Sequence, residues 1–330
     1  MRIALLGLGR IGLVHASTLS SLPNIDLVIC EPDAQRRGDA AAFGSVTESL
    51  EEALEKVDGV VVATPTALHT EHLLRAAEVG CPLFSEKPIS LDLATTVGVL
   101  DRLDAIGVPL QVGFQRRFDP GFVEMRRLIS EGELGDLYLI RTACHDRVPP
   151  PEGYLATSGS IFKDMHTHDF DAIRWLTGRP IETVFARGSV LVDDMFARAG
   201  DVDTCALTLT LEGGALAVIT GARADGVGYD HRTEVFGSKD SLSAGFDART
   251  PLRSTDPRGY SPAEPYDGFP ERFASAYRAE MVAFCDLVAG RRPNQAPGSA
   301  ALEALRVAVA ADRSLALGMP VAIGDITDDA

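Results

Sequence analysis

Short apolar runs alternate with amphipathic, helix-like stretches over the first third of the chain. The runs have the length of β-strands, and they cover residues 2–6, 25–30, 57–63, 83–85 and 109–113. Most positions of the 57–63 run are apolar, which is typical of a strand buried on both faces of a sheet. Strand–helix repeats of this length predict a doubly wound parallel α/β sheet, and we assign residues 1–118 to it.

The hydrophobic pattern changes to a period of two residues in the second half. Two strand-like runs, Thr204 to Leu211 and Ala215 to Gly221, flank the turn signal Glu212-Gly213-Gly214. Further elements are expected as strands at 184–192 and 233–236, a long loop at 250–270, and helices at 272–289 and 299–317. Residues 119–330 are therefore predicted to form an α+β domain with a large, open, mainly antiparallel sheet. One face of such a sheet can cover a helix, and the other can meet water or a second subunit.

Composition narrows the choice of partners. The chain has 330 residues and a formal net charge of −16 at pH 7, which disfavours nucleic acid and anionic membranes. No apolar stretch approaches the ~20 residues that a membrane-spanning helix needs. The five cysteines follow neither a metal-ligand nor a disulfide spacing, as expected for reduced thiols. We therefore expect a cytoplasmic protein that binds a small molecule.

The first predicted strand runs directly into the glycine-rich turn Gly7-Leu8-Gly9-Arg10-Ile11-Gly12, and a helix follows. In a Rossmann fold the first glycine permits the tight turn, and the second lets the backbone approach a pyrophosphate. The third glycine lets the helix pack close to the strand. Free N–H groups and the helix dipole then favour an anion at the helix N-terminus. The turn therefore predicts a dinucleotide site.

An acidic residue, Glu31, follows the second predicted strand about twenty residues after the glycines. A carboxylate here can accept hydrogen bonds from the adenosine ribose, and it would repel a 2′-phosphate. We therefore expect NAD rather than NADP. Arg36 and Arg37 follow closely and point toward NADP instead, unless they are exposed charges of the next helix, where long basic side chains usually lie.

The tripeptide Glu86-Lys87-Pro88 follows the apolar stretch Cys81 to Ser85, which is placed like the fifth strand of a nucleotide-binding sheet. This placement brings the Lys87 amine to the carboxyl edge of a parallel sheet, where open α/β folds bind ligands. A lysine there can hold or relay the proton of a hydroxyl that is being oxidised. Taken alone, Lys87 could equally be an exposed loop lysine, but a buried strand before it and a proline after it favour the functional interpretation.

A second candidate lies in the middle of the chain, where Asp164 to Asp171 contains two histidines and three aspartates. If one helix runs from here to a stop at Gly178, Asp164 and His168 are four residues apart on one face. A carboxylate beside an imidazole orients the ring and raises its pKa, as a general base poised near neutral pH requires. An ordinary surface pair and a metal site remain alternatives, but no further ligand cluster is evident, so we expect no metal.

With these motifs in view, the chain resembles the glucose–fructose oxidoreductase, inositol dehydrogenase and rhizopine-catabolism family (Gfo/Idh/MocA). The resemblance rests on residues 7–12, Ala63-Thr64-Pro65, Glu86-Lys87-Pro88, and Asp164 with His168, and it covers essentially the whole chain. Within the family the chain is most similar to inositol 2-dehydrogenases. This kinship implies NAD-linked oxidation of a ring hydroxyl of a polyol such as myo-inositol or scyllo-inositol. It also implies a homo-oligomer, either a tetramer or a dimer.

The resemblance also implies roles for single residues. Lys87 matches the lysine that touches the reacting hydroxyl, His168 the general base, and Asp164 its carboxylate partner. Further cofactor contacts are implied for Ala63, Thr64, Pro65, His69, Glu86 and Gln115. Substrate contacts are expected from Lys87, Asp164, His168, Arg116, His145, Asp146, His166 and Tyr277. Because His166 and the loop at 145–147 depart from the pattern of inositol enzymes, another sugar or aldose remains an alternative substrate. A dinucleotide-binding regulator without activity is a second alternative.

Overall fold

A computed structural model describes residues 1–247, 249 and 264–328, so most of the loop predicted at 250–270 lies outside the described residues. The described chain divides into two compact units. The first comprises Met1–Phe118 and Ser275–Glu303, and the second comprises Asp119–Ala274 and Ala304–Asp328. The hydrophobic pattern predicts that all of 119–330 belongs to the second domain, whereas the contacts of residues 275–303 group them with the first unit.

The first unit contains a six-stranded parallel sheet with the order β3-β2-β1-β4-β5-β6. Its strands are β1 (Arg2–Leu6), β2 (Asp26–Cys30), β3 (Ser45–Thr47), β4 (Gly59–Val62), β5 (Leu83–Ser85) and β6 (Leu110–Val112). Because β1 pairs with both β2 and β4, the winding reverses there, and such folds bind ligands beyond the carboxyl ends of these strands. The doubly wound sheet is confirmed; the pattern missed only β3, a three-residue strand with one aliphatic side chain.

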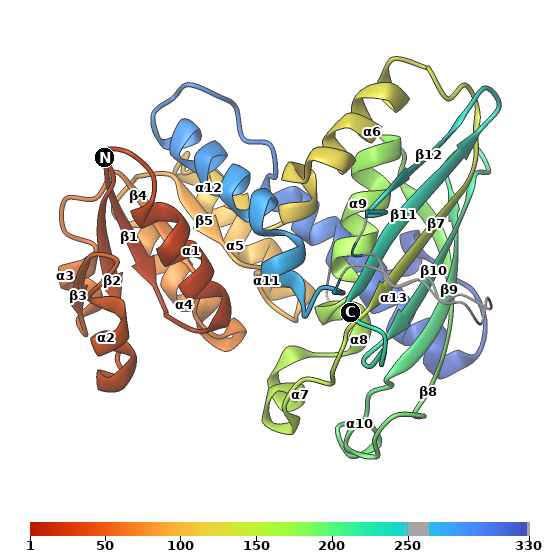
Figure 1. Ribbon diagram of the computed structural model, residues 1–330, viewed down its shortest axis with the longest axis horizontal. Coiled ribbons are helices and arrows are strands. Elements are labelled where there is room, and N and C mark those ends of the chain that lie inside the picture. The colour runs from red at the N-terminus through yellow and green to blue at the C-terminus, as the bar shows by residue number, and fades with distance from the viewer. Residues whose placement is uncertain (248, 250–263, 329–330) are drawn as a thin grey trace. The chain divides into compact units, whose positions relative to one another are not determined.

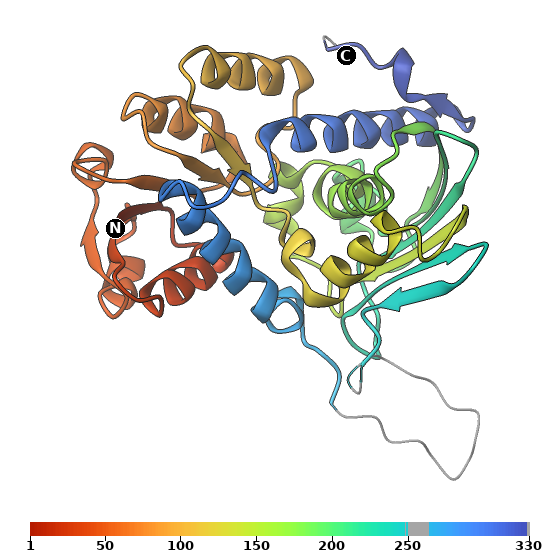
Figure 2. The same ribbon diagram turned by 90° about the horizontal axis from the view of Figure 1, so that it is seen from above.

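Helices cover both faces of this sheet. They are α1 (Arg10–Ser20), α2 (Ala34–Ala40), α3 (Leu50–Ala53), α4 (Thr66–Ala77), α5 (Leu93–Ala105) and α12 (Ala274–Val288). Figure 2 shows α1 and α12 on one face and α4 and α5 on the other. One core cluster joins Leu5, Val61 and Phe84 of the strands to Phe284 of α12, which explains why a late segment of the chain belongs to this unit.

The second unit contains a seven-stranded sheet with the order β12-β11-β7-β10-β9-β8-β13. Its strands are β7 (Leu137–His145), β8 (Ile181–Ser189), β9 (Thr204–Leu211), β10 (Leu216–Ala222), β11 (Asp230–Gly237), β12 (Ser241–Ala244) and β13 (Val321–Ala322). Only β7 and β10 pair in parallel, so the predicted mainly antiparallel sheet is confirmed. Gly213 and Gly214, with φ of +83° and +87°, form the predicted turn between β9 and β10.

The helices of the second unit pack mainly on one face of its sheet. They are α6 (Pro120–Ser130), α7 (Glu152–Ser158), α8 (Ile161–Asp164), α9 (Thr167–Thr177), α10 (Met195–Arg198), α11 (Phe269–Arg272) and α13 (Gly298–Leu317), with a 3₁₀ turn at Ile323–Asp325. The residues of α13 up to Glu303 and a further 3₁₀ turn, Gln115–Phe118, belong to the first unit. Figure 1 shows α6 and α9 against this sheet. The Ser314 hydroxyl of α13 accepts a hydrogen bond from Ala186 N of β8 at 3.0 Å, which ties α13 to the same sheet.

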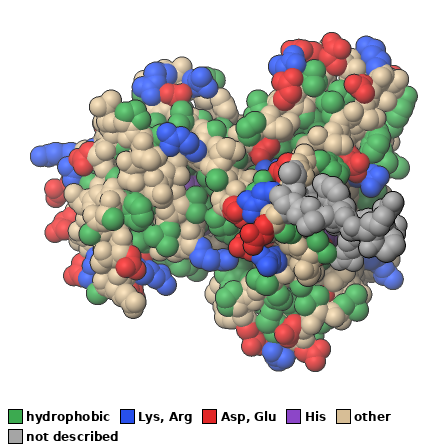
Figure 3. Space-filling view, in the orientation of Figure 1, with side chains coloured by type: hydrophobic (Ala, Val, Ile, Leu, Met, Phe, Trp, Pro, Cys, Tyr) green, Lys and Arg blue, Asp and Glu red, His purple; other side chains and the backbone are tan. Residues whose placement is uncertain are grey.

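The surface and the interior agree with the composition. Acidic and basic side chains are scattered over the face shown in Figure 3 rather than gathered into one basic patch. All five cysteines are buried, and none of them forms a disulfide. Among the described residues, no helix combines the length and the apolar character needed to cross a membrane.

Candidate active site

The glycine-rich turn at the end of β1 has the geometry that a dinucleotide needs. Gly7 has φ of +91°, and a Cβ on it would lie 2.8 Å from Ala63 O. A Cβ on Gly12 would lie 2.3 Å from Gly7 O, so both glycines are required by the packing of the turn. A Cβ on Gly9, in contrast, would meet no atom within 4 Å. Gly9 also precedes α1 without a side-chain cap, so the first N–H groups of this helix suit a pyrophosphate.

This geometry predicts a selective effect of Gly9→Ala. The new methyl group meets open space in the protein, and the backbone at Gly9 (φ −69°) suits alanine, so stability should not change. The methyl group would oppose a closely approaching pyrophosphate, and we expect NAD to bind roughly tenfold more weakly or worse. Titration calorimetry with NAD and a thermal melt check both points. Gly98→Ala, at an exposed and equally open position in α5, is the matched control and should bind NAD normally.

Glu31 fastens the glycine-rich turn to the end of β2. Its carboxylate is 3% exposed and accepts hydrogen bonds from Leu8 N at 2.8 Å and Asp33 N at 3.0 Å. Each carboxylate oxygen keeps a second lone pair that can accept a ribose hydroxyl. The Arg37 guanidinium donates to Glu31 O at 2.9 Å and pairs with Glu48 at 3.0 Å, and Arg36 is exposed on α2. Arg37 is thus engaged with backbone and an acid, which favours the NAD interpretation.

His69 links two loops at the carboxyl edge of the sheet. The side chain is 1% exposed, with one ring nitrogen 2.7 Å from Pro88 O and the other 2.8 Å from Thr64 O. Burial lowers the pKa of His69 below its ordinary value. The residue therefore holds the Ala63-Thr64-Pro65 loop against the Glu86-Lys87-Pro88 turn, and its ring nitrogens are occupied by this task rather than turned to a cofactor.

In the Glu86-Lys87-Pro88 turn, the acid points into the protein. Glu86 is 8% exposed and lies 2.7 Å from His15 Nε2 through Oε1, while its Oε2 accepts from Lys87 N at 3.3 Å. Lys87 is half-buried, and the Lys87–Pro88 peptide bond is cis. The lysine therefore lies just beyond the end of β5, one residue after Glu86, at the edge that the sequence predicts, and the buried Glu86 carboxylate holds its peptide. Among the other candidates in this unit, Gln115, Arg116 and Tyr277 are buried, at 3%, 2% and 5% exposure.

The structure interrupts the helix expected from Asp164 onward. Helix α8 ends at Asp164 and α9 begins at Thr167, with Met165 and His166 between them. Spacing along one helix therefore does not relate Asp164 to His168, and that part of the prediction is wrong. The expected stop is confirmed, since Gly178 caps α9 with φ of +67°. His168 lies half-buried in the first turn of α9.

His166 has a different environment from the one its position in the motif suggests. The side chain is 0% exposed, with Nδ1 2.7 Å from Asp169 Oδ2 and Nε2 3.1 Å from Cys205 Sγ. Burial disfavours the charged ring, but Cys205 and Asp169 outweigh it and raise the pKa of His166 to about 9. A Cβ on Gly221 would lie 2.1 Å from His166 Nε2, so β10 leaves room for this ring only through a glycine. The geometry does not support the expected substrate contact of His166.

Asp169 completes a buried network that anchors α9 to the sheet. Its Oδ1 accepts from the Thr142 hydroxyl of β7 at 3.3 Å and lies 3.6 Å from His231 Nε2 of β11. His166 reaches Cys205 of β9, so α9 is tied to three strands. The network fixes the start of the helix that carries His168.

Arg223 is the functional candidate that sequence reasoning missed. Its side chain is 4% exposed, and it pairs with Asp164 Oδ2 at 3.0 Å and Asp146 Oδ2 at 3.5 Å. The Tyr154 hydroxyl donates to Asp164 Oδ1 at 2.8 Å. Burial lowers the pKa of Arg223, but Asp164, Asp146 and Asp201 outweigh it and raise the pKa, so the guanidinium stays charged.

The pairing of β7 with β10 brings these residues together. His145 lies opposite Ala222, so Asp146 and Arg223 each follow the same point of the parallel ladder. His145 itself lies 3.3 Å from the Thr220 hydroxyl and 3.5 Å from Asp225 Oδ2. Two expected substrate residues, His145 and Asp146, thus belong to the same polar end of the sheet as Asp164.

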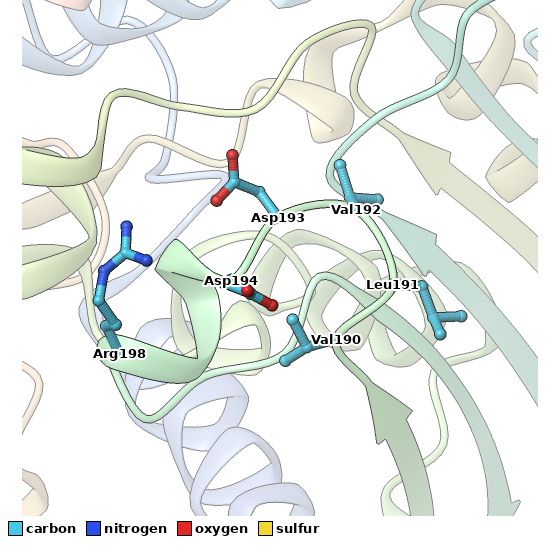
Figure 4. Close-up of a pocket in the computed structure, with 6 residues that line it drawn as sticks. All are labelled: Val190, Leu191, Val192, Asp193, Asp194 and Arg198. Carbon is cyan, nitrogen blue, oxygen red and sulfur yellow. The ribbon is translucent and has the colours of Figure 1, made fainter.

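An open pocket lies elsewhere in the second unit, at the turn between β8 and α10 (Figure 4). It is lined by Val190, Leu191, Val192, Asp193, Asp194 and Arg198. The buried Asp203 carboxylate shapes this turn by accepting hydrogen bonds from the N–H groups of Leu191, Val192 and Asp193. None of the predicted catalytic residues lines this pocket, so we assign the candidate site to the polar groups described above.

The dinucleotide turn and the lysine after β5 in the first unit, with Asp164 and His168 on helices of the second, indicate an oxidoreductase with a nicotinamide-binding domain. Comparison with known families gives the same class. Residues 1–114 match the oxidoreductase family with an NAD-binding Rossmann fold, and residues 122–243 match the C-terminal domain of GFO/IDH/MocA proteins. The chain belongs to the Gfo/Idh/MocA family.

Similar proteins cover nearly the whole chain. The myo-inositol 2-dehydrogenase of Thermotoga maritima is 36% identical, over 96% of each chain. The inositol 2-dehydrogenase of Rhizobium meliloti is 35% identical, over 96% of this chain and 97% of its own. A crystal structure of scyllo-inositol dehydrogenase from Lactobacillus casei, with bound NAD(H) and scyllo-inositol, has 27% identity and a TM-score of 0.89, over 98% of this chain and 99% of that one.

Proposed function

We propose that the protein is an NAD-dependent dehydrogenase that oxidises a ring hydroxyl of a cyclic polyol, myo-inositol or scyllo-inositol, to the ketone (an inosose). The observation that carries this proposal is the similarity to inositol 2-dehydrogenases over nearly the full length of the chain. The open face at Gly9 and the occupied guanidinium of Arg37 support NAD as the cofactor.

The proposed reaction assigns a task to three side chains. NAD, when bound, accepts the hydride. The His168 imidazole removes the hydroxyl proton as general base, and the Lys87 ammonium stabilises the negative charge that develops on the same oxygen. Asp164 stabilises the imidazolium that forms; Arg223 holds this carboxylate by an ion pair, and Tyr154 holds it by a hydrogen bond.

A substrate panel tests the proposal. Purified protein is mixed with NAD and with inositol isomers, aldoses and open-chain polyols, and the appearance of NADH absorbance is followed. We expect turnover with at least one inositol and a lower KM for NAD than for NADP. Turnover only with an aldose would mean that the protein is a sugar dehydrogenase of the same family and not an inositol dehydrogenase. NAD binding without turnover on any compound would contradict the proposed activity and favour a regulator.

We further propose a cytoplasmic homo-oligomer, a tetramer or a dimer. The second sheet supports this because its uncovered face carries large apolar side chains, including Tyr138 at 57% and Leu216 at 44% exposure. Buried cysteines that form no disulfide are typical of a reducing compartment. Light scattering coupled to gel filtration measures the assembly directly.

A further inference from the structure

Three ionisable side chains form a buried cluster next to the Glu86-Lys87-Pro88 turn. His15 comes from α1, Glu86 directly follows β5, and Glu280 comes from α12. They are 0%, 8% and 0% exposed. One imidazole nitrogen and one oxygen of each carboxyl group all lie within 4.8 Å of one another. The roles assigned above use none of these side chains on the reacting atoms, so the cluster needs its own explanation.

Glu86 is the member that connects the cluster to Lys87. Its two oxygens are divided between His15 Nε2, at 2.7 Å, and the N–H group of Lys87, at 3.3 Å. On a third side, a Cβ on Gly113 would lie 2.8 Å from Glu86 Oε2, so the backbone just after β6 packs closely against this carboxylate. Any shift of Glu86 would therefore move the Lys87 peptide.

Glu280 is fully buried, and the residues described around it offer no hydrogen bond that would stabilise an ionised carboxylate. Within the described residues neither of its carboxyl oxygens has a hydrogen-bond partner. The groups that face it are His15 from α1, Glu86 after β5, and the neutral Gln111 of β6, whose side chain donates to Glu280 O at 3.3 Å. Tyr277, one turn earlier on α12, packs edge-on against the His15 ring at 6.0 Å.

Electrostatics in this environment allow one ionised carboxyl group rather than two. Two carboxylates this close, away from water, would repel each other and lose their hydration. Burial and the charge of Glu86 raise the pKa of Glu280 well above its ordinary value. Glu86 already has the two hydrogen bonds that stabilise an anion, so the proton belongs on Glu280.

We propose that Glu280 is a positioning residue: as a neutral acid it leaves Glu86 as the single carboxylate of the cluster, and Glu86 in turn holds Lys87 in place. Glu280 acts through Glu86 and Lys87 and not on the reacting atoms. The catalytic consequence rests on the proposed dehydrogenase function, whereas the protonation state of Glu280 does not.

A stability measurement tests the protonation state without any substrate. A raised pKa in the folded state means that stability present at low pH is lost as pH rises above the unfolded value of 4.5. Glu280→Gln has no such loss, so the unfolding constant of the wild type relative to this variant should grow with pH, by up to about tenfold per unit. Denaturant unfolding from pH 5 to 8 measures this ratio. Cys285→Ala, a buried change on the same helix, should give a ratio independent of pH over this range. If the ratio for Glu280→Gln is instead independent of pH from 5 to 8, Glu280 is ionised in the folded state like an ordinary carboxyl group and the proposal is wrong.

Kinetics test the link to Lys87. We expect Glu280→Ala to lower kcat about tenfold with an unchanged Kd for NAD, and Glu280→Gln to restore kcat to within about threefold. In a Lys87→Ala background, Glu280→Ala should lower kcat only slightly further, because both changes remove the contribution of a correctly placed Lys87 ammonium. If Glu280→Ala lowers kcat by the same factor with and without Lys87, Glu280 acts independently of Lys87. Absence of turnover by the wild type would contradict the proposed function but leave the stability test intact.

Discussion

Replacement of His168 by alanine is expected to lower kcat by about 10²–10⁴-fold, the usual effect of removing a positioned general base. The affinity for NAD should stay nearly unchanged, because His168 belongs to the second unit and the dinucleotide turn to the first. The fold should also persist, since His166 and Asp169 make buried contacts that anchor the start of α9 and are left unchanged. Stopped-flow measurement of NADH formation separates the chemical step from product release.

Lys87→Ala should have a comparable effect if both side chains act on the same hydroxyl. The kcat of the double variant should then fall by less than the product of the two single-variant factors, because the effects of residues that act as a unit are not additive. Arg174→Ala, a half-buried change farther along α9, is the matched control and should retain turnover. Near-normal kcat for both His168→Ala and Lys87→Ala would remove the basis of the proposed chemistry.

The sequence predicted the features that depend on local spacing. The glycine-rich turn, the acid after β2 and the Glu86-Lys87-Pro88 turn after β5 each begin where a strand ends, so the period of the hydrophobic pattern is enough to locate them. The two-residue turn of glycines between β9 and β10 was readable for the same reason. The strand β7 was not, because its interior contains Arg141 and Thr142, and its pairing with β10 and β11 supplies what the local pattern lacks.

The part of the site that could not be predicted from the sequence depends on how strands far apart in the chain pair with each other. Arg223 has no motif around it, and it meets Asp164 and Asp146 only because β10 pairs with β7 in parallel. The sequence also did not show which of the two histidines of the 164–171 segment is buried and which is accessible. A break of two residues between α8 and α9 turns His166 into the interior and leaves His168 half-exposed, and no propensity in the segment distinguishes these outcomes.

Arg223→Met is expected to lower the free energy of unfolding by about 3–5 kcal/mol, because it leaves buried carboxylates without their countercharge. Asp164 and Asp146 lose an ion pair, and Asp201, whose pKa burial already raises, loses a neighbouring positive charge. The loss should depend on pH with a definite sign. Carboxyl groups that have lost a cation are easier to protonate in the folded state, and a protonated acid needs no partner. The difference between variant and wild type should therefore be small near pH 4 and widen toward pH 7.

Denaturant unfolding at several pH values measures this difference, and two further variants make it specific. In an Asp164→Asn background the cost of Arg223→Met should shrink, because one of the stranded charges is already gone. Arg198→Met removes a guanidinium from an ion pair with Glu152 in which both side chains are about 60% exposed, and such surface pairs contribute little to stability. A pH-independent cost of Arg223→Met would mean that its aliphatic packing, and not its charge, holds this end of the sheet. In that case Asp164 would need another group to keep it oriented toward the reaction.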